Sequence, residues 1–332
     1  MKISKPTYYD SFLCSASACP DSCCKDWIVQ VDDESAQRYR RLSGNLGASL
    51  RQAMAQADGD TILTLTPSGK CPMWLPDGLC RIQAELGADA LCRTCRNFPR
   101  LRHDYGDFLE LGLELSCPEA AKWILSGKWD YVTLQATGGE KPEYDTDAMA
   151  ILYQSRQKVL HFLENEEYPI EQTLAIILIY GYALQEALDG GRPADIHPES
   201  TLATAKSIAA DGDINTLLEF FQRLEILTPA WNNRLQAPVK SPWREEHRAM
   251  TRYFVYRYWL QAISDYDLVS RIKLIIVSNL VIKALGGDIY QTAQLYSKEI
   301  ENNTDNIDAI LNGAYTSPAM TDTQLLDLLL KE

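Results

Sequence analysis

The nine cysteines of this 332-residue chain all lie within its first 117 residues. They form two blocks, Cys14-x4-Cys19-x3-Cys23-Cys24 and Cys71-Pro72-x7-Cys80-x11-Cys92-x2-Cys95, and a closing Cys117-Pro118 step. Soft thiolates select zinc or iron–sulfur clusters. The sequence therefore predicts a metal site in the front third of the chain. All nine cysteines are candidate ligands: Cys14, Cys19, Cys23, Cys24, Cys71, Cys80, Cys92, Cys95 and Cys117.

The expected compartment is the cytoplasm. Residues 1–10 are polar and contain no apolar signal-peptide core, and the chain has no run of 18 apolar residues. A reducing compartment disfavours disulfides, and an odd number of cysteines does not fit a closed disulfide framework. Metal binding is therefore the preferred interpretation of the thiols.

The spacing favours an all-thiolate site. Cys92 and Cys95 lie about one helical turn apart, which is typical of two ligands to one metal centre. His103 is the only histidine near either block. We therefore expect an iron–sulfur cluster of the 4Fe–4S type, with structural zinc or metal-free thiols as alternatives. The neighbours Cys23 and Cys24 are not expected to bind one metal ion together, so either some cysteines are structural or two centres exist.

The charge of the chain, −13 in total, is unevenly distributed. Residues 1–118 carry 13 Lys/Arg and 15 Asp/Glu, whereas residues 119–332 carry 19 and 30. This acidity disfavours nucleic acid, which is bound through a basic surface. It suits a partner that presents lysines, through long-range attraction, or simply keeps the protein soluble.

We predict a mainly α fold with a cysteine-rich region at 1–130, a linker at 131–145 and a helical domain at 146–332. The front region is expected to contain a helix over 33–57, a strand over 61–65, and two short helices over 79–86 and 88–97. A hairpin around Gly106 and a helix from Pro118 to about Leu125 should follow. Beyond the linker we read a helical bundle. Its expected helices are 146–164, 170–188, 199–210, 214–226, 242–263, 267–285, 289–302 and 321–331.

The cysteine patterns resemble those of a known family. The motifs are Phe12-x-Cys14-x4-Cys19-x3-Cys23-Cys24-x2-Trp27, Cys71-Pro72-x6-Leu79-Cys80-Arg81-Ile82-Gln83-x2-Leu86-Gly87, Leu91-Cys92-x2-Cys95-Arg96-x2-Pro99-Arg100 and Leu115-Ser116-Cys117-Pro118. In this order they are similar to the flagellin lysine-N-methylase family of the FliB type. The core pattern is also similar to a broader cysteine-cluster family of small iron- or zinc-chelating proteins.

The resemblance implies an S-adenosylmethionine-dependent protein lysine N-methyltransferase that acts on flagellin and needs a cysteine-bound iron–sulfur cluster. All nine cysteines stand at family positions. The chain has no strand followed by a Gly-x-Gly turn, and Cys24 interrupts the Cys-x3-Cys-x2-Cys triplet of radical enzymes that Cys19 and Cys23 begin. We therefore expect an unfamiliar cofactor site next to the cluster. Polar and radical methyl transfer both stay open.

Catalytic residues are not identified by the sequence. Weak candidates for a base are Tyr8, Tyr9, Tyr105, Glu110 and Glu114. The stripe of Tyr253, Tyr256, Arg257, Trp259 and Leu260 could line a lysine side chain or could be helix packing. Arginines around the second block, namely Arg81, Arg93, Arg96, Arg100 and Arg102, could bind an anion or lie on the surface. The alternative function is a non-enzymatic iron or zinc carrier or redox sensor.

Overall fold

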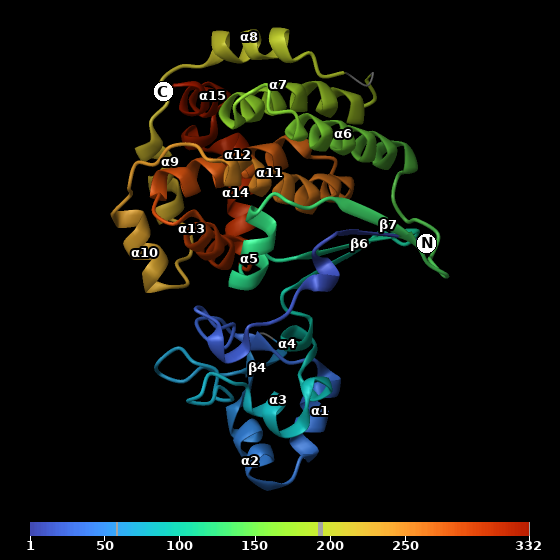
Figure 1. The fold of residues 1–332 in the computed structure, drawn as a ribbon, viewed down its shortest axis with the longest axis vertical. Helices are drawn as coiled ribbons and strands as arrows, with labels where there is room; N and C mark the ends of the chain where they lie inside the picture. Colours follow the sequence, from blue (N-terminus) through green and yellow to red (C-terminus); the bar gives the residue numbers. More distant parts are fainter. Residues whose placement is uncertain (58, 192–194, 332) are drawn as a thin grey trace.

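The computed structural model describes residues 1–57, 59–191 and 195–331. Figure 1 shows a small lobe, coloured blue to cyan, beneath a larger body of helices with one sheet at its side. In the sequence, the small lobe lies between the strands Lys2–Pro6 and Arg100–Asp104, which both belong to the sheet of the larger body. The predicted mainly α fold with small β elements is confirmed.

The small lobe contains a three-stranded sheet and four short helices. Its elements are β2 (Val29–Gln30), α1 (Asp33–Arg41), α2 (Gly44–Ala53), β3 (Met54–Ala57), β4 (Asp60–Leu63), α3 (Arg81–Leu86) and α4 (Arg93–Asn97), with strand order β2-β4-β3. The single helix predicted over 33–57 is wrong. The chain leaves the helix at Leu42, turns at Gly44 with φ +77°, and ends as a strand that pairs with β4. The sequence predicted one helix because the apolar residues keep a helical spacing across this break.

The second sheet joins segments that are far apart in the sequence. Its strands are β1 (Lys2–Pro6), β5 (Arg100–Asp104), β6 (Phe108–Leu113) and β7 (Tyr131–Gln135), in the order β5-β6-β1-β7. The hairpin predicted around Gly106 is confirmed as β5 and β6. β1 runs parallel to β6 and antiparallel to β7. The predicted linker therefore begins with a strand, and only the residues after Gln135 connect the sheet to the helices.

The helices of the large body follow the prediction closely. They are α5 (Pro118–Leu125), α6 (Thr146–Glu164), α7 (Ile170–Leu188), α8 (Pro198–Ile208), α9 (Ile214–Gln222), α10 (Pro229–Gln236), α11 (Glu245–Tyr258), α12 (Leu268–Leu285), α13 (Ile289–Tyr296), α14 (Thr304–Thr316) and α15 (Asp322–Leu330). The predicted bounds of α5, α6 and α7 match the structure. α10 and α14 were not predicted.

α12 lies at the centre of the large body. It is buried on all sides and packs against α7, α11, α13 and α14, which fits a helix without a polar face. The core around it includes the fully buried Trp231 and Trp259. A short π-helical segment, Ser297–Glu301, extends α13 toward the small lobe. No helix within the described ranges is long and apolar enough to cross a bilayer.

Candidate metal centre

The nine cysteines are positioned by irregular backbone and by helix starts. Four of them lie on the segment between β1 and β2, whose only helical elements are two short 3-10 turns. Cys71 and Cys80 flank a loop, Cys92 and Cys95 lie at α4, and Cys117 precedes α5. All nine are free thiols.

Five cysteines gather around the core of the small lobe. Cys71 and Cys92 are buried members of this core, and Cys24, Cys80 and Cys95 pack against it; we call them the five-cysteine group. The Cys71 N–H donates to the Cys24 carbonyl oxygen at 2.8 Å, which ties the first block to the second. Burial raises the pKa of Cys71 to about 11, and repulsion from the thiolates of Cys24, Cys80 and Cys92 contributes to the increase.

The other four cysteines, Cys14, Cys19, Cys23 and Cys117, form the four-cysteine group. Cys117 packs in the core of the large body, not in that of the small lobe. Burial raises its pKa to about 11, and the thiolates of Cys19 and Cys14 add repulsion. Cys23 in turn interacts electrostatically with Cys14 and Cys117. This group thus joins the first block to the residue before α5.

Two hydrogen-bonded thiol pairs connect these cysteines. The hydrogen bond between Cys23 and Cys24 raises the pKa of Cys23 and lowers that of Cys24 to about 7. The same arrangement between Cys92 and Cys95 lowers the pKa of Cys92 to about 7 and raises that of Cys95. One member of each pair therefore carries thiolate character near neutral pH. Because Cys23 and Cys24 belong to different groups, their pair also marks where the two groups meet.

Three cysteines occupy the N-cap positions of helices. They are Cys80 before α3, Cys92 before α4 and Cys117 before α5. None of the three side chains forms a cap hydrogen bond, but the backbone N–H groups of the first turn oppose the effect of burial on their pKa values. Donation from N–H groups favours thiolates and is typical of sulfurs that bind metal centres.

In their present conformations these side chains outline no site for a single metal ion. Among the residues that the structure describes, no three or more His, Cys, Asp or Glu side chains are arranged to hold such an ion. In a 4Fe–4S cluster each thiolate binds a different iron, so the ligand sulfurs stand further apart than those of a single ion. The donor set, which consists of sulfur alone with N–H donors at three helix starts, fits a cluster chemically.

The loop that carries the first block docks on the large body through charged side chains. Lys298, on the π-helical segment, lies 3.3 Å from the carboxylates of Asp21 and of Asp26. The Gln294 amide donates to Asp21 at 2.8 Å. A small cavity beside Cys23 is lined by Asp21, Ser22, Trp27, Phe98, Ser116, Lys298 and Asn302. No sequence motif marks Lys298, so it was not among the predicted site residues.

Most of the weak candidates turn out to be structural. Tyr253, Tyr256, Trp259 and Leu260 are buried, so the stripe is helix packing and not an exposed wall. Arg257 lies 3.2 Å from the buried carboxylate of Glu301. Burial raises the pKa of Tyr8, Tyr9, Tyr105 and Glu114.

Glu110 forms a buried ion pair with Arg156, a residue that the sequence analysis did not single out. Four of the five arginines of the second block, namely Arg93, Arg96, Arg100 and Arg102, are exposed. The fifth, Arg81, pairs with Glu85 at 2.6 Å. The interpretation of these arginines as surface residues therefore holds. Trp74 forms an isolated β-bridge with Cys80 and packs against the same core as the five-cysteine group.

Comparison with known proteins gives three relatives from Salmonella. The chain is 34% identical to the flagellar biosynthetic protein FliU of Salmonella muenchen, over 47% of this chain and 93% of FliU. It is 33% identical to a lysine-N-methylase of Salmonella choleraesuis and 31% identical to one of Salmonella typhimurium, each over 48% of this chain. The matches span 40% of each lysine-N-methylase. No family model and no solved structure matches the chain.

Proposed function

Because the chain belongs to the flagellin lysine-N-methylase family of the FliB type, we propose that it is a protein lysine N-methyltransferase acting on flagellin, with S-adenosylmethionine as the methyl donor. The observation that carries the proposal is the similarity to FliU over nearly its whole length and to two proteins named lysine-N-methylase. The excess of acidic residues in 119–332, 30 against 19 basic ones, supports it. Such a charge attracts a substrate that presents lysines.

The reaction requires an uncharged amine. The lysine ammonium first loses its proton to a base or to water, because a protonated amine has no lone pair for attack. The lone pair then forms the N–C bond to the methyl carbon while the C–S bond breaks. Its electron pair stays on sulfur, which gives S-adenosylhomocysteine. This polar transfer balances: the nitrogen gains one methyl group, the sulfur keeps the electron pair of the C–S bond, and one proton is released.

We further propose that the cysteines bind iron–sulfur clusters, one in each group. Four thiolates suffice for one 4Fe–4S cluster. The four-cysteine group supplies that number, and the five-cysteine group supplies it through Cys24, Cys71, Cys80 and Cys92. The support is the packing of Cys24, Cys71, Cys80 and Cys92 at the core of the small lobe, whereas Cys117 packs in the core of the large body. A bound cluster supplies one-electron chemistry and holds the loops that carry its ligands.

The test is methyl transfer to flagellin by protein purified without oxygen. The protein is incubated with flagellin and S-adenosylmethionine labelled at the methyl group, and modified lysines are identified by mass spectrometry. We expect labelled ε-N-methyllysines in flagellin. The control is flagellin whose lysines have been blocked by acetylation, which should gain no label. Absence of transfer by iron-loaded protein would refute the enzyme and leave the metal-carrier alternative.

A further inference from the structure

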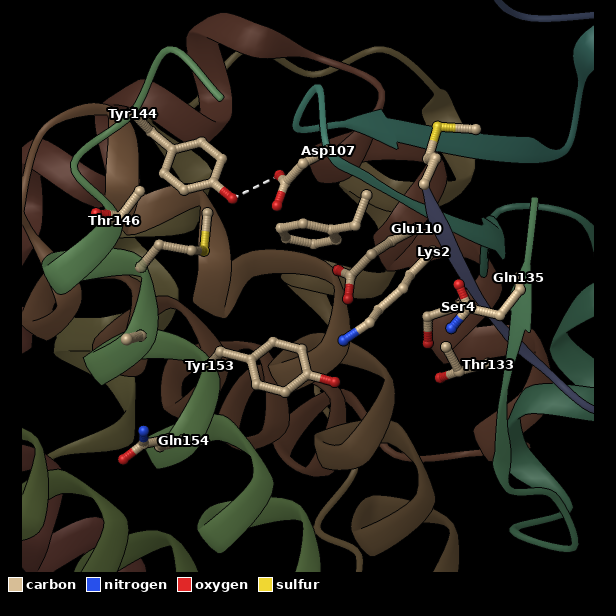
Figure 2. A pocket seen from close by; sticks show the side chains of 14 residues that line it. Lys2, Ser4, Asp107, Glu110, Thr133, Gln135, Tyr144, Thr146, Tyr153 and Gln154 are labelled. Carbon is tan, nitrogen blue, oxygen red and sulfur yellow. Dashed lines mark hydrogen bonds between the residues drawn. The ribbon is translucent and has the colours of Figure 1, made fainter. Parts of the chain in front are cut away.

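A pocket of about 560 Å³ lies between the four-stranded sheet and the first two turns of α6. This volume falls within the range of about 300–1,000 Å³ that is typical of sites for small molecules. Figure 2 shows side chains from both elements pointing into the space. The pocket lies at the start of β1 and β6, whereas Cys14 and Cys117 follow the ends of these strands. It is therefore separate from the cysteines.

The floor of the pocket consists of two rows of paired residues on one face of the sheet. The pairing register places Lys2 between Phe108 and Gln135 in one row. It places Ser4 between Glu110 and Thr133 in the next row. Residues paired across strands share a face, and all six of these residues line the pocket. Five of them have polar side chains.

A polar, open floor is unusual beneath a helix, because a sheet face that lies under a helix is normally apolar and packed. Further along the same face, the residues near Pro6 and Tyr131 are covered by α11, and the Tyr131 ring stacks on Tyr256 at 4.0 Å. The buried pair of Glu110 and Arg156 marks the boundary between the packed and the open parts. The hollow thus lies beside a part of the same face where α11 packs on the sheet.

Aromatic rings form one side of the pocket. The Phe108 ring lies 6.4 Å from those of Tyr144 and Tyr153, at interplanar angles of 75° and 79°. The Tyr144 hydroxyl donates to Asp107 at 2.6 Å, which holds its ring at the rim (Figure 2). Tyr153 is 42% exposed. Such rings offer flat surfaces to a planar ring or to a cation.

The charges and hydrogen-bonding groups indicate the chemistry of the ligand. Lys2 offers a cation that extends into the pocket toward Tyr153, and Asp107 offers a carboxylate at the rim (Figure 2). Neutral donors and acceptors line the rest, namely Ser4, Thr133, Gln135, Thr146 and Gln154. Opposite charges together with rings and hydroxyls complement a zwitterion that also carries a planar ring and hydroxyl groups. A bare lysine side chain would use neither the cation nor most of the volume.

We propose that this pocket binds S-adenosylmethionine, whose amino-acid zwitterion, ribose hydroxyls and adenine ring match these features. The inference rests on the proposed function, which requires this methyl donor. It places the donor away from the cysteines, whereas the sequence analysis expected the cofactor next to the cluster. Lys2 is then the partner of the donor's carboxylate, and the aromatic side of the pocket receives the adenine.

The test is a pocket-filling variant with a matched control. Ala150 lines the pocket from α6, and Ala150→Trp places an indole in it; Gln157, on the same helix, lies outside the lining and is exposed. We expect isothermal titration with S-adenosylhomocysteine to show binding by the wild type and by Gln157→Trp, and at least a tenfold loss in Ala150→Trp. Lys2→Met should lose about tenfold as well, because it removes one charge-assisted hydrogen bond.

Photolabelling of the wild type locates the site without depending on whether a variant folds. Ultraviolet crosslinking of the wild type with methyl-labelled S-adenosylmethionine should label residues 129–156, which line the pocket and contain no cysteine. Label confined to cysteine-bearing peptides, or unchanged binding by Ala150→Trp, would overturn the inference while flagellin methylation still supported the proposed function. Loss of binding to a lysine peptide in Ala150→Trp, with binding of the nucleoside intact, would assign the pocket to the acceptor instead. If the wild type neither bound the nucleoside nor methylated flagellin, both proposals would fail.

Discussion

Replacing Arg156 by methionine should strongly destabilise the large body. Arg156 donates to the two carboxylate oxygens of Glu110 at 2.8 and 2.5 Å and to the Tyr256 carbonyl oxygen at 3.3 Å. The side chains of Arg156 and Glu110 are only 1% and 2% exposed. Arg156→Met would leave a buried carboxylate without its partner. Breaking a buried pair in this way costs about 3–5 kcal/mol.

The assay is urea unfolding, monitored by circular dichroism and by tryptophan fluorescence. The matched control is Lys158→Met on the same helix, because the side chains of Lys158 and its partner Asp195 are 45% and 72% exposed. An exposed pair contributes about 0–1 kcal/mol. We therefore expect the midpoint to fall clearly in Arg156→Met and hardly at all in Lys158→Met.

A double variant separates the pair from its surroundings. Arg156→Met combined with Glu110→Leu replaces both charges by apolar side chains, which is often close to neutral. Its free energy of unfolding should thus recover most of the single-variant loss, with a coupling of more than about 2 kcal/mol. A loss below about 1 kcal/mol in Arg156→Met, or additive effects in the double variant, would refute the reasoning.

Other parts of the structure give further predictions. Gly286 has φ +59°, and a Cβ there would lie 2.2 Å from the Val239 carbonyl oxygen, whereas Gly190 has φ +97° and open space around it. Gly286→Ala should therefore lower the free energy of unfolding by more than Gly190→Ala, which should cost about 1–2 kcal/mol from strain alone; equal losses in urea titrations would contradict this. Burial lowers the pKa of His247 to about 4. Since the unfolded chain binds that proton near pH 6.5, stability should be full above this pH and fall as the pH drops toward 4, by up to about 3 kcal/mol. His247→Gln should reduce the acid slope of the unfolding free energy by about one proton, and an unchanged slope would contradict the assignment.

The helices were predictable where local signals agree. α6 begins after Asp145, whose carboxylate accepts from the backbone N–H groups of Asp147 and Ala148, and its apolar residues follow a helical period. Prolines mark the starts of the other two, Pro118 in the first turn of α5 and Pro169 just before α7. α10 could have been found as well, because Thr228 followed by Pro229 is an N-cap followed by a proline in the first turn. Its polar composition hid it within a predicted loop.

The sheets were harder to predict, because their pairing joins distant segments. β1 and β7 are separated by more than 120 residues, and neither alternates strongly between apolar and polar residues. A strand of this kind is specified by its partners and not by its own sequence. The pocket beside α6 was invisible for the same reason, since its floor exists only once β1, β6 and β7 are in register.

The sequence located the cysteine region but not its division into groups. Spacing paired Cys92 with Cys95, which the structure confirms as neighbours through their hydrogen bond. It could not show that Cys24 joins the core of the small lobe while Cys117 lies in that of the large body. That division depends on where the two cores lie, which is a tertiary property. The metal itself stays a prediction.

The most direct test of the account is the iron and acid-labile sulfide content of protein purified without oxygen. We predict a brown protein with about eight iron and eight sulfide per chain, as two 4Fe–4S clusters require. Cys80→Ser should remove the cluster of the five-cysteine group, and Cys14→Ser that of the four-cysteine group. Each variant should therefore contain about half of the wild-type iron and sulfide. A colourless wild-type protein that contains zinc or no metal would contradict the account.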